Sequence, residues 1–486
     1  MGSSVTGKLA GCETRMMMAK THTVIRDARI LTMVDGDREF RGDVLIADGS
    51  IASVGQCSVP DGAEVIEAKG GILLPGFVDT HRHVWQTQLR TAAGDWSLYD
   101  YLVHMRMTYS SFYNPDDVYL GNYVGALEAL NAGVTTMVDH CHILNSPEHS
   151  DEAIRGLRDS GTRGVFCYGL FANPTSHSPF IIDPDMAWRY ADARRLRAGT
   201  LSSSDGRILL GLAPNEPEST PFATSAIDVS FAREIDAHVV SCHVAMGAYD
   251  QGRQFVRQLH EAGLLDQRFL FVHGASLTDA ELGMIADAGA GISSTPETEM
   301  QMGMGYPVAM RARAAGVNVS LGVDIVSNYS GDLFTQMRMM LQSARAQAHA
   351  LLEARREAPR AVGATTQEVL RMATLGGAEA INLSDRIGTV EKGKKADLIL
   401  IRTDTIGMVP ATDAVAATVY NAKAEDVEMV MVDGRVVKRD GVLVDVDWPS
   451  IARRLQTSAH RIISSARAVD PAIAKGVVDG FFAAPH

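Results

Sequence analysis

Histidine and acidic residues recur at the ends of short apolar runs in this chain. The first such run ends in His81-Arg82-His83 and the second in Asp139-His140-Cys141-His142. Later runs end in Asn215 and Glu216, His243, His273, Glu297 and Glu299, and Asp324. Imidazole nitrogens and carboxylate oxygens bind zinc or iron, and a bound metal lowers the pKa of water enough to produce hydroxide. The pattern therefore indicates metal-assisted hydrolysis.

The spacing of His81 and His83 fits such a site. In an extended strand, residues two positions apart point to the same side, so both imidazoles would project into one cavity. With one imidazole from another strand and one carboxylate, they would form a mononuclear site for zinc or iron. A His-x-His pair alone is weak evidence, because an isolated histidine is more often structural. The histidines and Asp324 at later strand ends make the metal site a much stronger hypothesis.

The elements that would position these residues alternate regularly. From Gly71 onwards, eight apolar runs are separated by helical patterns. The runs span residues 72–83, 134–142, 162–171, 207–216, 238–244, 268–276, 290–297 and 317–324. Two of the helical stretches, 150–161 and 278–289, begin with a Ser or Thr N-cap and end at Gly. The pattern predicts an α/β fold with a closed (β/α)₈ barrel, whose active site lies at the strand ends. A doubly wound open sheet is the alternative.

Short β segments flank this barrel on both sides. Asp48-Gly49 and Asp433-Gly434 stand between apolar runs and predict hairpin turns. A sheet that begins before the barrel is therefore expected to be completed after it. We expect a poorly ordered extension over 1–20, the β parts over 21–73 and 385–446, the barrel over 74–384, and a helix and tail over 447–486.

Composition limits the function classes. The chain has 486 residues, of which 46% are hydrophobic and 21% are charged, which is ordinary for a globular protein. The formal net charge of −13 argues against a nucleic-acid partner. The 5 cysteines include no Cys-x-x-Cys pair and fit a reduced, cytoplasmic setting. No apolar run approaches the roughly 18–20 residues of a membrane span.

The first run, LLPGFVDTHRHVWQTQLR, resembles the first-strand signature of the amidohydrolase superfamily. The closest branch contains the cytosine/guanine deaminases and triazine chlorohydrolases. The resemblance continues through GALEALNAGVTTMVDH, FVHGASLTDAELGMIADAGAGISSTP, VNVSLGVD and IGTVEKGKKADLILI, and it covers the chain from about Thr23 to Gly441. It implies a (β/α)₈ TIM barrel with a small β-sandwich domain formed from both chain ends, in agreement with the periodicity.

The resemblance also implies roles for the polar residues. His81, His83, His243 and Asp324 would bind the metal, and Asp324 would also act as a base. His273 matches a histidine that polarises the attacked group or shuttles protons. The fourth run contains no Lys that could bridge two metals, so one divalent metal is expected. Zn²⁺ is the preferred metal, and Fe²⁺ is the alternative because the same ligands serve both.

Substrate contacts are implied on the segment after the first strand. Gln86 matches a residue that often contacts substrate in the deaminases, and Trp85 and Trp96 match aromatic residues that line the pocket. Core packing is an equally good interpretation of both tryptophans. In this branch the segment that carries Tyr101, His104 and Arg106 covers the pocket. His104 is a further candidate substrate contact, although surface exposure is the favoured interpretation.

The chain departs from the branch at the fifth strand. Its relatives read His-x-x-Glu there, and that Glu moves protons between water, ring nitrogen and leaving amine, whereas this chain has Met246. On the seventh strand, Glu299 replaces an Asn and Glu297 fills a variable place. We hypothesise that Glu299, or less favourably Glu297, supplies the missing acid. The alternative is a solvated loop charge or a salt bridge with Arg311 or Arg313.

Two further departures concern the second and fourth strands. Asn215 and Glu216 stand where relatives place a substrate-specific His or Arg, so Glu216 is a candidate substrate contact or a second candidate acid. His140 and His142 follow the second strand, and additional metal ligation by either of them is left open.

Three hypotheses follow for function. In the first, the protein is a mononuclear metal-dependent hydrolase whose metal-bound hydroxide attacks an sp² carbon of a polar aromatic or heterocyclic substrate and breaks a C–N bond. In the second, the loss of Glu at position 246 changes the outcome to another leaving group, ring opening or a lyase reaction. The third, a metal-binding protein without catalysis, is disfavoured by the retained ligands. The expected partners are a small-molecule substrate and further copies of the chain, as a homodimer or larger homo-oligomer, with no nucleic acid and no membrane.

Overall fold

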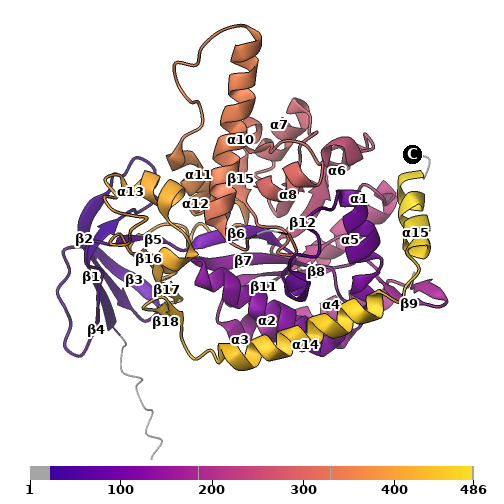
Figure 1. Cartoon of the computed structure of the whole chain (residues 1–486), viewed down its shortest axis with the longest axis horizontal. Helices are drawn as coiled ribbons and strands as arrows, with labels where there is room; N and C mark the ends of the chain where they lie inside the picture. The colour runs from indigo at the N-terminus through magenta and orange to yellow at the C-terminus, as the bar shows by residue number, and fades with distance from the viewer. Residues whose placement is uncertain (1–21, 184, 329, 484–486) are drawn as a thin grey trace, which may run out of the picture.

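The computed structural model describes residues 22–183, 185–328 and 330–483, and a parallel β-barrel forms its centre (Figure 1). The sheet contains eight strands in chain order. They are β6 (Phe77–Arg82), β7 (Val134–Cys141), β8 (Arg163–Gly169), β11 (Ile208–Ala213), β12 (Val240–Val244), β13 (Phe269–His273), β14 (Gly291–Ser294) and β15 (Asn318–Leu321). Each of the eight predicted runs contains one of these strands, so the barrel prediction is confirmed. The predicted extension over 1–20 lies outside the described residues.

The barrel closes between its first and last strands. The His83 backbone N–H donates to the Asp324 carbonyl at 2.7 Å, and the Asp324 N–H donates to the His81 carbonyl at 2.8 Å. These bonds connect the end of β6 to the segment after β15, and the open-sheet alternative is therefore wrong. Because the closing bonds involve three predicted metal ligands, closure of the barrel also fixes the backbone of the site.

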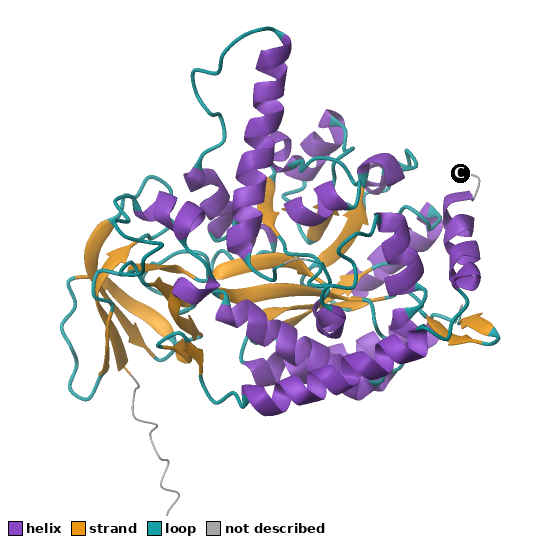
Figure 2. Ribbon diagram, viewed as in Figure 1, coloured by secondary structure: helices purple, strands orange, loops and turns teal. Residues whose placement is uncertain are grey.

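Helices cover the outside of the barrel (Figure 2). They include α2 (Pro115–Asn131), α3 (Pro147–Ser160), α4 (Ala187–Ala198), α5 (Phe222–Glu234), α6 (Phe255–Glu261), α7 (Asp279–Asp287), α9 (Ala309–Ala314), α10 (Leu333–Ala354), α11 (Thr366–Met372) and α12 (Leu375–Ala380). Thr278 caps α7 as predicted, in a capping box with Glu281. Helix α3 begins earlier than predicted, since Pro147 occupies its first turn and suits that position.

The two chain ends form a second sheet of nine strands, beside one end of the barrel (Figure 2). Its strands are β1 (His22–Ile30), β2 (Phe40–Ala47), β3 (Ser50–Gly55), β4 (Glu64–Glu67), β5 (Ile72–Pro75), β16 (Leu398–Ile401), β17 (Val427–Val432), β18 (Arg435–Arg439) and β19 (Val442–Leu443). The antiparallel pairing of β5 with β16 joins the N-terminal and C-terminal parts. Both predicted hairpins are present, with positive φ at Asp48, Gly49, Asp433 and Gly434.

Gly76 carries the chain from this sheet into the barrel. A Cβ atom at this position would lie 2.1 Å from the Thr135 hydroxyl oxygen, so the close approach of β6 to β7 requires a glycine. The first predicted run is therefore divided, with β5 in the outer sheet and β6 in the barrel.

The C-terminal segment contains two helices. Helix α14 (Trp448–Ala466) runs along the outside of the barrel, and α15 (Pro471–Ala483) packs beside α1 (Leu98–Tyr101) and the short helix η2 (Leu102–Arg106) (Figure 1). The predicted tail is thus helical through residue 483. Ala474 and Val478 of α15 share an apolar cluster with Val103 and Met107. Among the described helices, none is long and apolar enough to cross a membrane.

Candidate active site

The four predicted metal ligands converge at the C-terminal end of the barrel. The Nε2 atom of His81 lies 3.2 Å from Nε2 of His243 and 3.3 Å from Oδ1 of Asp324. Nε2 of His83 lies 3.4 Å from the same Asp324 oxygen. All four side chains are buried. Four atoms with lone pairs, from β6, β12 and the segment after β15, therefore face one small volume.

This arrangement fits a divalent cation. Ligand atoms bound tetrahedrally to zinc at about 2.0–2.2 Å are about 3.3–3.6 Å apart, which is close to the separations found here. Burial lowers the pKa of His81 to about 4, and burial together with the nearby His81 lowers the pKa of His83 as well. Both imidazoles are therefore neutral near pH 7 and offer lone pairs to a metal rather than protons.

Neighbouring groups orient two of these imidazoles. Nδ1 of His83 donates to the His140 backbone carbonyl at 2.8 Å. Nδ1 of His243 lies 2.9 Å from a carboxylate oxygen of Glu216, to which it donates. In each ring the opposite nitrogen, Nε2, consequently carries the lone pair and faces the centre. Glu216, which the sequence suggested as a substrate contact, is thus also the hydrogen-bond partner of a candidate metal ligand.

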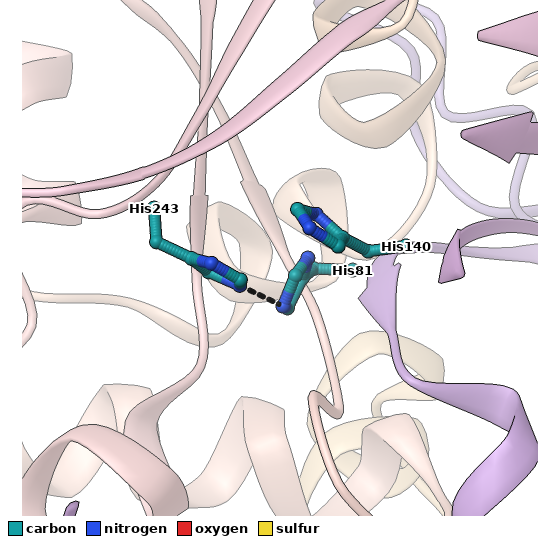
Figure 3. A group of neighbouring side chains, drawn as sticks. All are labelled: His81, His140 and His243. Carbon is teal, nitrogen blue, oxygen red and sulfur yellow. Dashed lines mark hydrogen bonds between the residues drawn. The ribbon is translucent and has the colours of Figure 1, made fainter. Parts of the chain in front are cut away.

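His140 of β7 belongs to the same cluster (Figure 3). One ring nitrogen each of His81, His140 and His243 lies within 4.8 Å of the others. The His140 ring stacks on His243 with the ring centroids 4.4 Å apart, and its Nδ1 is hydrogen-bonded with the Ser241 hydroxyl at 3.0 Å. The geometry is compatible with His140 as an additional ligand, an alternative that the sequence left open.

His142 occupies the wall beside this cluster. Its ring stacks on His83 at a centroid distance of 4.1 Å, and its Nδ1 accepts a hydrogen bond from Trp85 Nε1 at 3.1 Å. Trp85 is fully buried and packs edge-on against Tyr113. Trp85 is not among the pocket-lining residues, so it acts as a core residue that holds His142.

His273 and Asp324 lie at strand ends with an uncommon backbone conformation. Their φ angles are 73° and 69°, in the left-handed region that residues other than glycine seldom adopt. Nδ1 of His273 is 3.1 Å from the Thr295 hydroxyl and 3.6 Å from Oε1 of Glu299. Glu299, in α8 (Pro296–Gln301), also accepts from the Thr295 N–H at 2.8 Å. Glu299 is completely buried and does not line the pocket, so it can act on substrate only through His273.

The other seventh-strand carboxylate points elsewhere. Glu297 accepts a hydrogen bond from the Gln336 side chain at 2.6 Å and does not line the pocket. The alternative of a salt bridge with Arg311 or Arg313 is wrong, because Arg311 pairs with Asp279 at 2.8 Å and Arg313 pairs with Glu368 at 2.7 Å.

A pocket opens above the metal cluster. His83, His243, His273 and Asp324 line it together with Tyr101, Arg106, Glu216, Glu218 and Met246. Much of the remaining lining is apolar or aromatic and includes Phe171, Tyr249, Phe481 and Phe482. The pocket therefore combines polar groups at the metal cluster with an apolar wall, as is typical of small-molecule sites.

Most of the predicted substrate contacts lie outside this lining. Tyr101 lines the pocket, whereas Gln86 lies behind it and donates a hydrogen bond to the Tyr101 hydroxyl at 2.6 Å. Trp96 packs on His104 at a centroid distance of 5.0 Å, and neither residue lines the pocket.

Of the two fourth-strand candidates, Glu216 lines the pocket and Asn215 does not. The Asn215 backbone and side-chain amides both donate to Asp228, at 3.0 and 3.1 Å, which turns Asn215 away from the pocket. Glu216 is thus the one predicted substrate contact among the described residues that lines the pocket.

Several lining residues had no clear signal in the sequence. Glu218 lies two positions beyond the last residue of the fourth predicted run, and Phe481 and Phe482 belong to α15. Arg106 lay on the segment expected to cover the pocket, but its role was not predicted. Its guanidinium donates to the His142 carbonyl at 3.1 Å and lies 4.4 Å from the Phe171 ring centroid. Burial lowers the pKa of Arg106 to about 10, so it remains a cation near pH 7.

The model of the amidohydrolase family matches residues 72–437, which include every barrel strand and the whole metal cluster. The chain belongs to the amidohydrolase family. Members of this family generally bind a divalent metal, in agreement with the cluster described above. The expectation that the protein is an enzyme of this family is therefore confirmed.

The curated relatives to which this amidohydrolase is similar include several deaminases. It is 30% identical over 456 residues to a 5-methylthioadenosine/S-adenosylhomocysteine deaminase of Pelotomaculum thermopropionicum, with 91% of this chain and 99% of the relative covered. It is 26% identical to a 5'-deoxyadenosine deaminase of Methanosarcina barkeri, with 92% and 99% covered.

Solved structures agree on the fold. An adenosine deaminase of Xanthomonas campestris with bound zinc matches with a TM-score of 0.79 and 24% identity, over 91% of this chain and 99% of that chain. An atrazine chlorohydrolase of Arthrobacter aurescens with zinc matches with a TM-score of 0.77 and 21% identity, over 90% and 100%. At these identities the likeness shows the shared barrel and end sheet rather than a shared substrate.

Proposed function

We propose that this amidohydrolase removes an exocyclic amine from a purine nucleoside or a related aminated heterocycle by hydrolysis and releases ammonia. The observation that carries the proposal is the convergence of His81, His83, His243 and Asp324, of which all but His81 line the same pocket as His273. The names of the deaminase relatives support the substrate class. The proposed cofactor is one divalent metal, with zinc preferred.

The chain's own residues would divide the chemical work as follows. A divalent metal held by His81, His83, His243 and Asp324 would supply hydroxide near neutral pH. Asp324 is positioned to accept the first proton of the attacking water and to return it to the leaving amine. His273 lines the same pocket and would donate to, or polarise, the group that gains negative charge at the attacked carbon.

Thr295 and Glu299 would serve this reaction through His273. Both lie near Nδ1 of His273, and they leave its other nitrogen to face the pocket. Such partners fix the orientation and protonation state of a catalytic imidazole. We therefore assign Glu299 a positioning role in place of the direct acid role that the sequence suggested.

The apolar wall supports a flat heterocyclic substrate with a hydrophobic extension. Phe171, Tyr249, Phe481 and Phe482 offer aromatic surface, and Arg106 is buried among them with one guanidinium nitrogen that lacks a partner among the described residues. A carbonyl, hydroxyl or carboxylate oxygen of the substrate would satisfy that donor.

A second candidate function is hydrolysis with a leaving group other than an amine, as in a chlorohydrolase. The observation that favours it is Met246, which lines the pocket and cannot protonate an amine. A leaving group such as chloride departs without a proton, so this reaction would tolerate the substitution.

Mass-resolved product analysis distinguishes the two functions. Metal-loaded protein would be incubated with adenosine, 5'-deoxyadenosine, 5'-methylthioadenosine, aminopyrimidines and both amino- and chloro-substituted triazines. Replacement of an amine by hydroxyl with stoichiometric ammonia supports the deaminase proposal. Release of chloride from the chlorotriazines, with no ammonia from the aminated compounds, would support the second candidate. A panel that gives no product at all would contradict both.

A further inference from the structure

Hydrolytic deamination needs a group that protonates the ring nitrogen next to the attacked carbon. The fifth strand does not provide one, because Met246 lines the pocket and its thioether carries no exchangeable proton. The inference below rests on the proposed deaminase function and concerns which side chain takes over this task.

Three carboxylates among the described residues line the pocket: Glu216, Glu218 and Asp324. Asp324 belongs to the metal cluster, and Glu216 is hydrogen-bonded to Nδ1 of the ligand His243. The two seventh-strand carboxylates, Glu297 and Glu299, are outside the lining. Glu218 is thus the remaining pocket carboxylate that neither binds the metal nor orients a ligand.

Glu218 is held against the very segment in which relatives have their acid. Its Oε1 atom accepts a hydrogen bond from the Ala245 backbone N–H at 2.9 Å, across 27 positions of sequence. Ala245 directly precedes Met246 and has a positive φ of 50°, which marks a sharp bend at the end of β12. A loop after β11 therefore brings a carboxyl group beside the position where the fifth strand lacks one.

The second carboxyl oxygen of Glu218, Oε2, differs from Oε1 in its hydrogen bonding. Oε2 is buried and has no hydrogen bond of normal distance and angle to a described residue, although the Gln251 backbone N–H lies close enough to lower the carboxyl pKa. The whole residue is only 9% exposed. A buried polar atom without a hydrogen-bond partner costs free energy of folding. A bound ligand that donates a hydrogen bond to Oε2 would remove this cost. Burial raises the pKa of Glu218, an effect that the Ala245 and Gln251 backbone N–H groups partly offset, which favours the protonated form needed by an acid.

We propose that Glu218 is the catalytic proton-transfer residue of this amidohydrolase, in place of a fifth-strand Glu. The protonated Glu218 gives its proton to the ring nitrogen while the water oxygen bonds to the adjacent carbon and the first water proton passes to Asp324. Glu218 then accepts the second water proton from the new hydroxyl group, and Asp324 gives its proton to the amine. The C–N bond breaks, and the products are a carbonyl with a ring N–H and ammonia.

The central experiment compares Glu218→Gln with the wild-type protein. Gln keeps an oxygen that can accept from the Ala245 N–H, so the loop fold is preserved, but it cannot transfer protons. With the best aminated substrate of the panel, kcat should fall by at least about 100-fold, because general acid–base catalysis contributes about 10²–10⁴-fold. Metal content should equal that of the wild type. Calorimetry with metal-free protein should show substrate Kd values within about tenfold of each other, since the loss is chemical.

Two double variants test whether the loss of activity comes from the missing carboxyl group itself. In the double variant E218Q/M246E the carboxyl group returns to the fifth strand, and kcat should recover at least about tenfold over Glu218→Gln. The matched control E218Q/M246Q has the same size and polarity at position 246 without the carboxyl group, and it should show no recovery.

The outcomes separate this inference from the proposed function. If the wild type releases ammonia and Glu218→Gln stays within threefold of its kcat, Glu218 is not the acid and the deaminase assignment stands. If the wild type releases no ammonia from any aminated substrate, the deaminase function fails and the role of Glu218 fails with it. Equal rescue by M246E and M246Q would show a packing effect and would likewise overturn the inference.

Discussion

The floor of the pocket and its wall come from different parts of the fold. The floor consists of the four candidate metal ligands His81, His83, His243 and Asp324, which lie on or directly after barrel strands. The bonds that close the barrel fix the backbone at His81, His83 and Asp324, and the pairing of β12 with β13 holds His243. The wall consists of loop and helix residues such as Glu218, Arg106 and the phenylalanines of α15. The sequence resemblance predicts every ligand in the floor, whereas in the wall it predicts an acid at the position of Met246.

This difference teaches where the chemistry and the specificity of the protein reside. Barrel strands cannot shift without breaking the sheet, so they hold the metal ligands in one geometry. Loops tolerate substitution, and a new side chain can enter the pocket from a neighbouring loop. We therefore expect changes in the floor to abolish reaction, and changes in the wall to alter rate, proton transfer or substrate choice.

The largest expected effect is in the floor. Asp324→Asn removes a metal ligand and the proposed base together, so kcat should fall by about 10³-fold or more and metal content should drop. Steady-state kinetics and metal analysis of the purified variant measure both. Retention of near-normal turnover by this variant would break the contrast between floor and wall.

A smaller effect is expected where wall and floor meet. Glu216→Gln weakens the hydrogen bond that orients His243, and metal affinity should fall by about 10- to 100-fold. Competition with a chelator measures the affinity. Glu218→Gln, two positions along the same loop, is the matched control and should leave metal affinity unchanged. Equal losses in both variants would mean that the loop acts as a whole.

The next prediction concerns Glu299, which we propose positions the His273 imidazole. Glu299→Gln changes the partner of His273 Nδ1, so kcat should fall by about 10- to 100-fold while KM and metal content stay near the wild-type values. The pH dependence of kcat should change as well, because burial raises the pKa of the Glu299 carboxyl group and the amide that replaces it does not titrate. An unchanged pH profile together with reduced kcat would indicate a structural role only.

The α15 wall should affect binding more than chemistry. Truncating Phe481 and Phe482 to Ala removes aromatic surface from the pocket, and KM should rise about tenfold, since burying one large apolar side chain contributes about 1.5–3 kcal/mol. The value of kcat should change less than threefold. A fall in kcat with constant KM would show that α15 organises the reacting groups instead.

The smallest effect concerns Glu297, which is outside the pocket. Burial, with the charge of Asp332, raises the pKa of Glu297 from 4.5 to about 7. The folded state therefore binds more protons than the unfolded state between these pH values, and stability falls as pH rises through that window. Glu297→Gln should remove this loss and stabilise the protein at pH 8 by about 3 kcal/mol relative to its effect at pH 4, since each pKa unit corresponds to about 1.4 kcal/mol. Urea unfolding at both pH values measures it, and turnover should stay within twofold.

The barrel and the convergence of the four candidate ligands could be predicted because their signals are local. Alternating apolar runs mark the strands, and the two-residue spacing of His81 and His83 places both imidazoles on one side of β6. The carboxyl ends of parallel strands meet at one end of a barrel, so His243 and Asp324 had to join them. The hairpins at Asp48-Gly49 and Asp433-Gly434 were equally local, since a two-residue turn needs positive φ at both positions.

The substrate contacts could not be predicted in the same way. Trp85 and Gln86 have suitable chemistry, but the packing around them turns one towards His142 and the other towards Tyr101. In the sequence, Glu299 follows the seventh barrel strand closely, where a side chain could reach the pocket. In the structure it lies in the first turn of α8, and its carboxyl group lies behind His273. Which face of a short helix meets the pocket depends on tertiary packing and leaves no periodic signal in so few residues.

The sequence by itself determined the barrel, the four candidate metal ligands and the presence of Met246 where the resemblance predicts an acid. These follow from strand periodicity and from side-chain chemistry at fixed strand positions. Only the tertiary structure decided that Glu218 contacts Ala245 and that α15 reaches the pocket. Such contacts join residues far apart in the chain, and they form because the loop after β11 and the C-terminal helix pack over the barrel end, which no local pattern encodes.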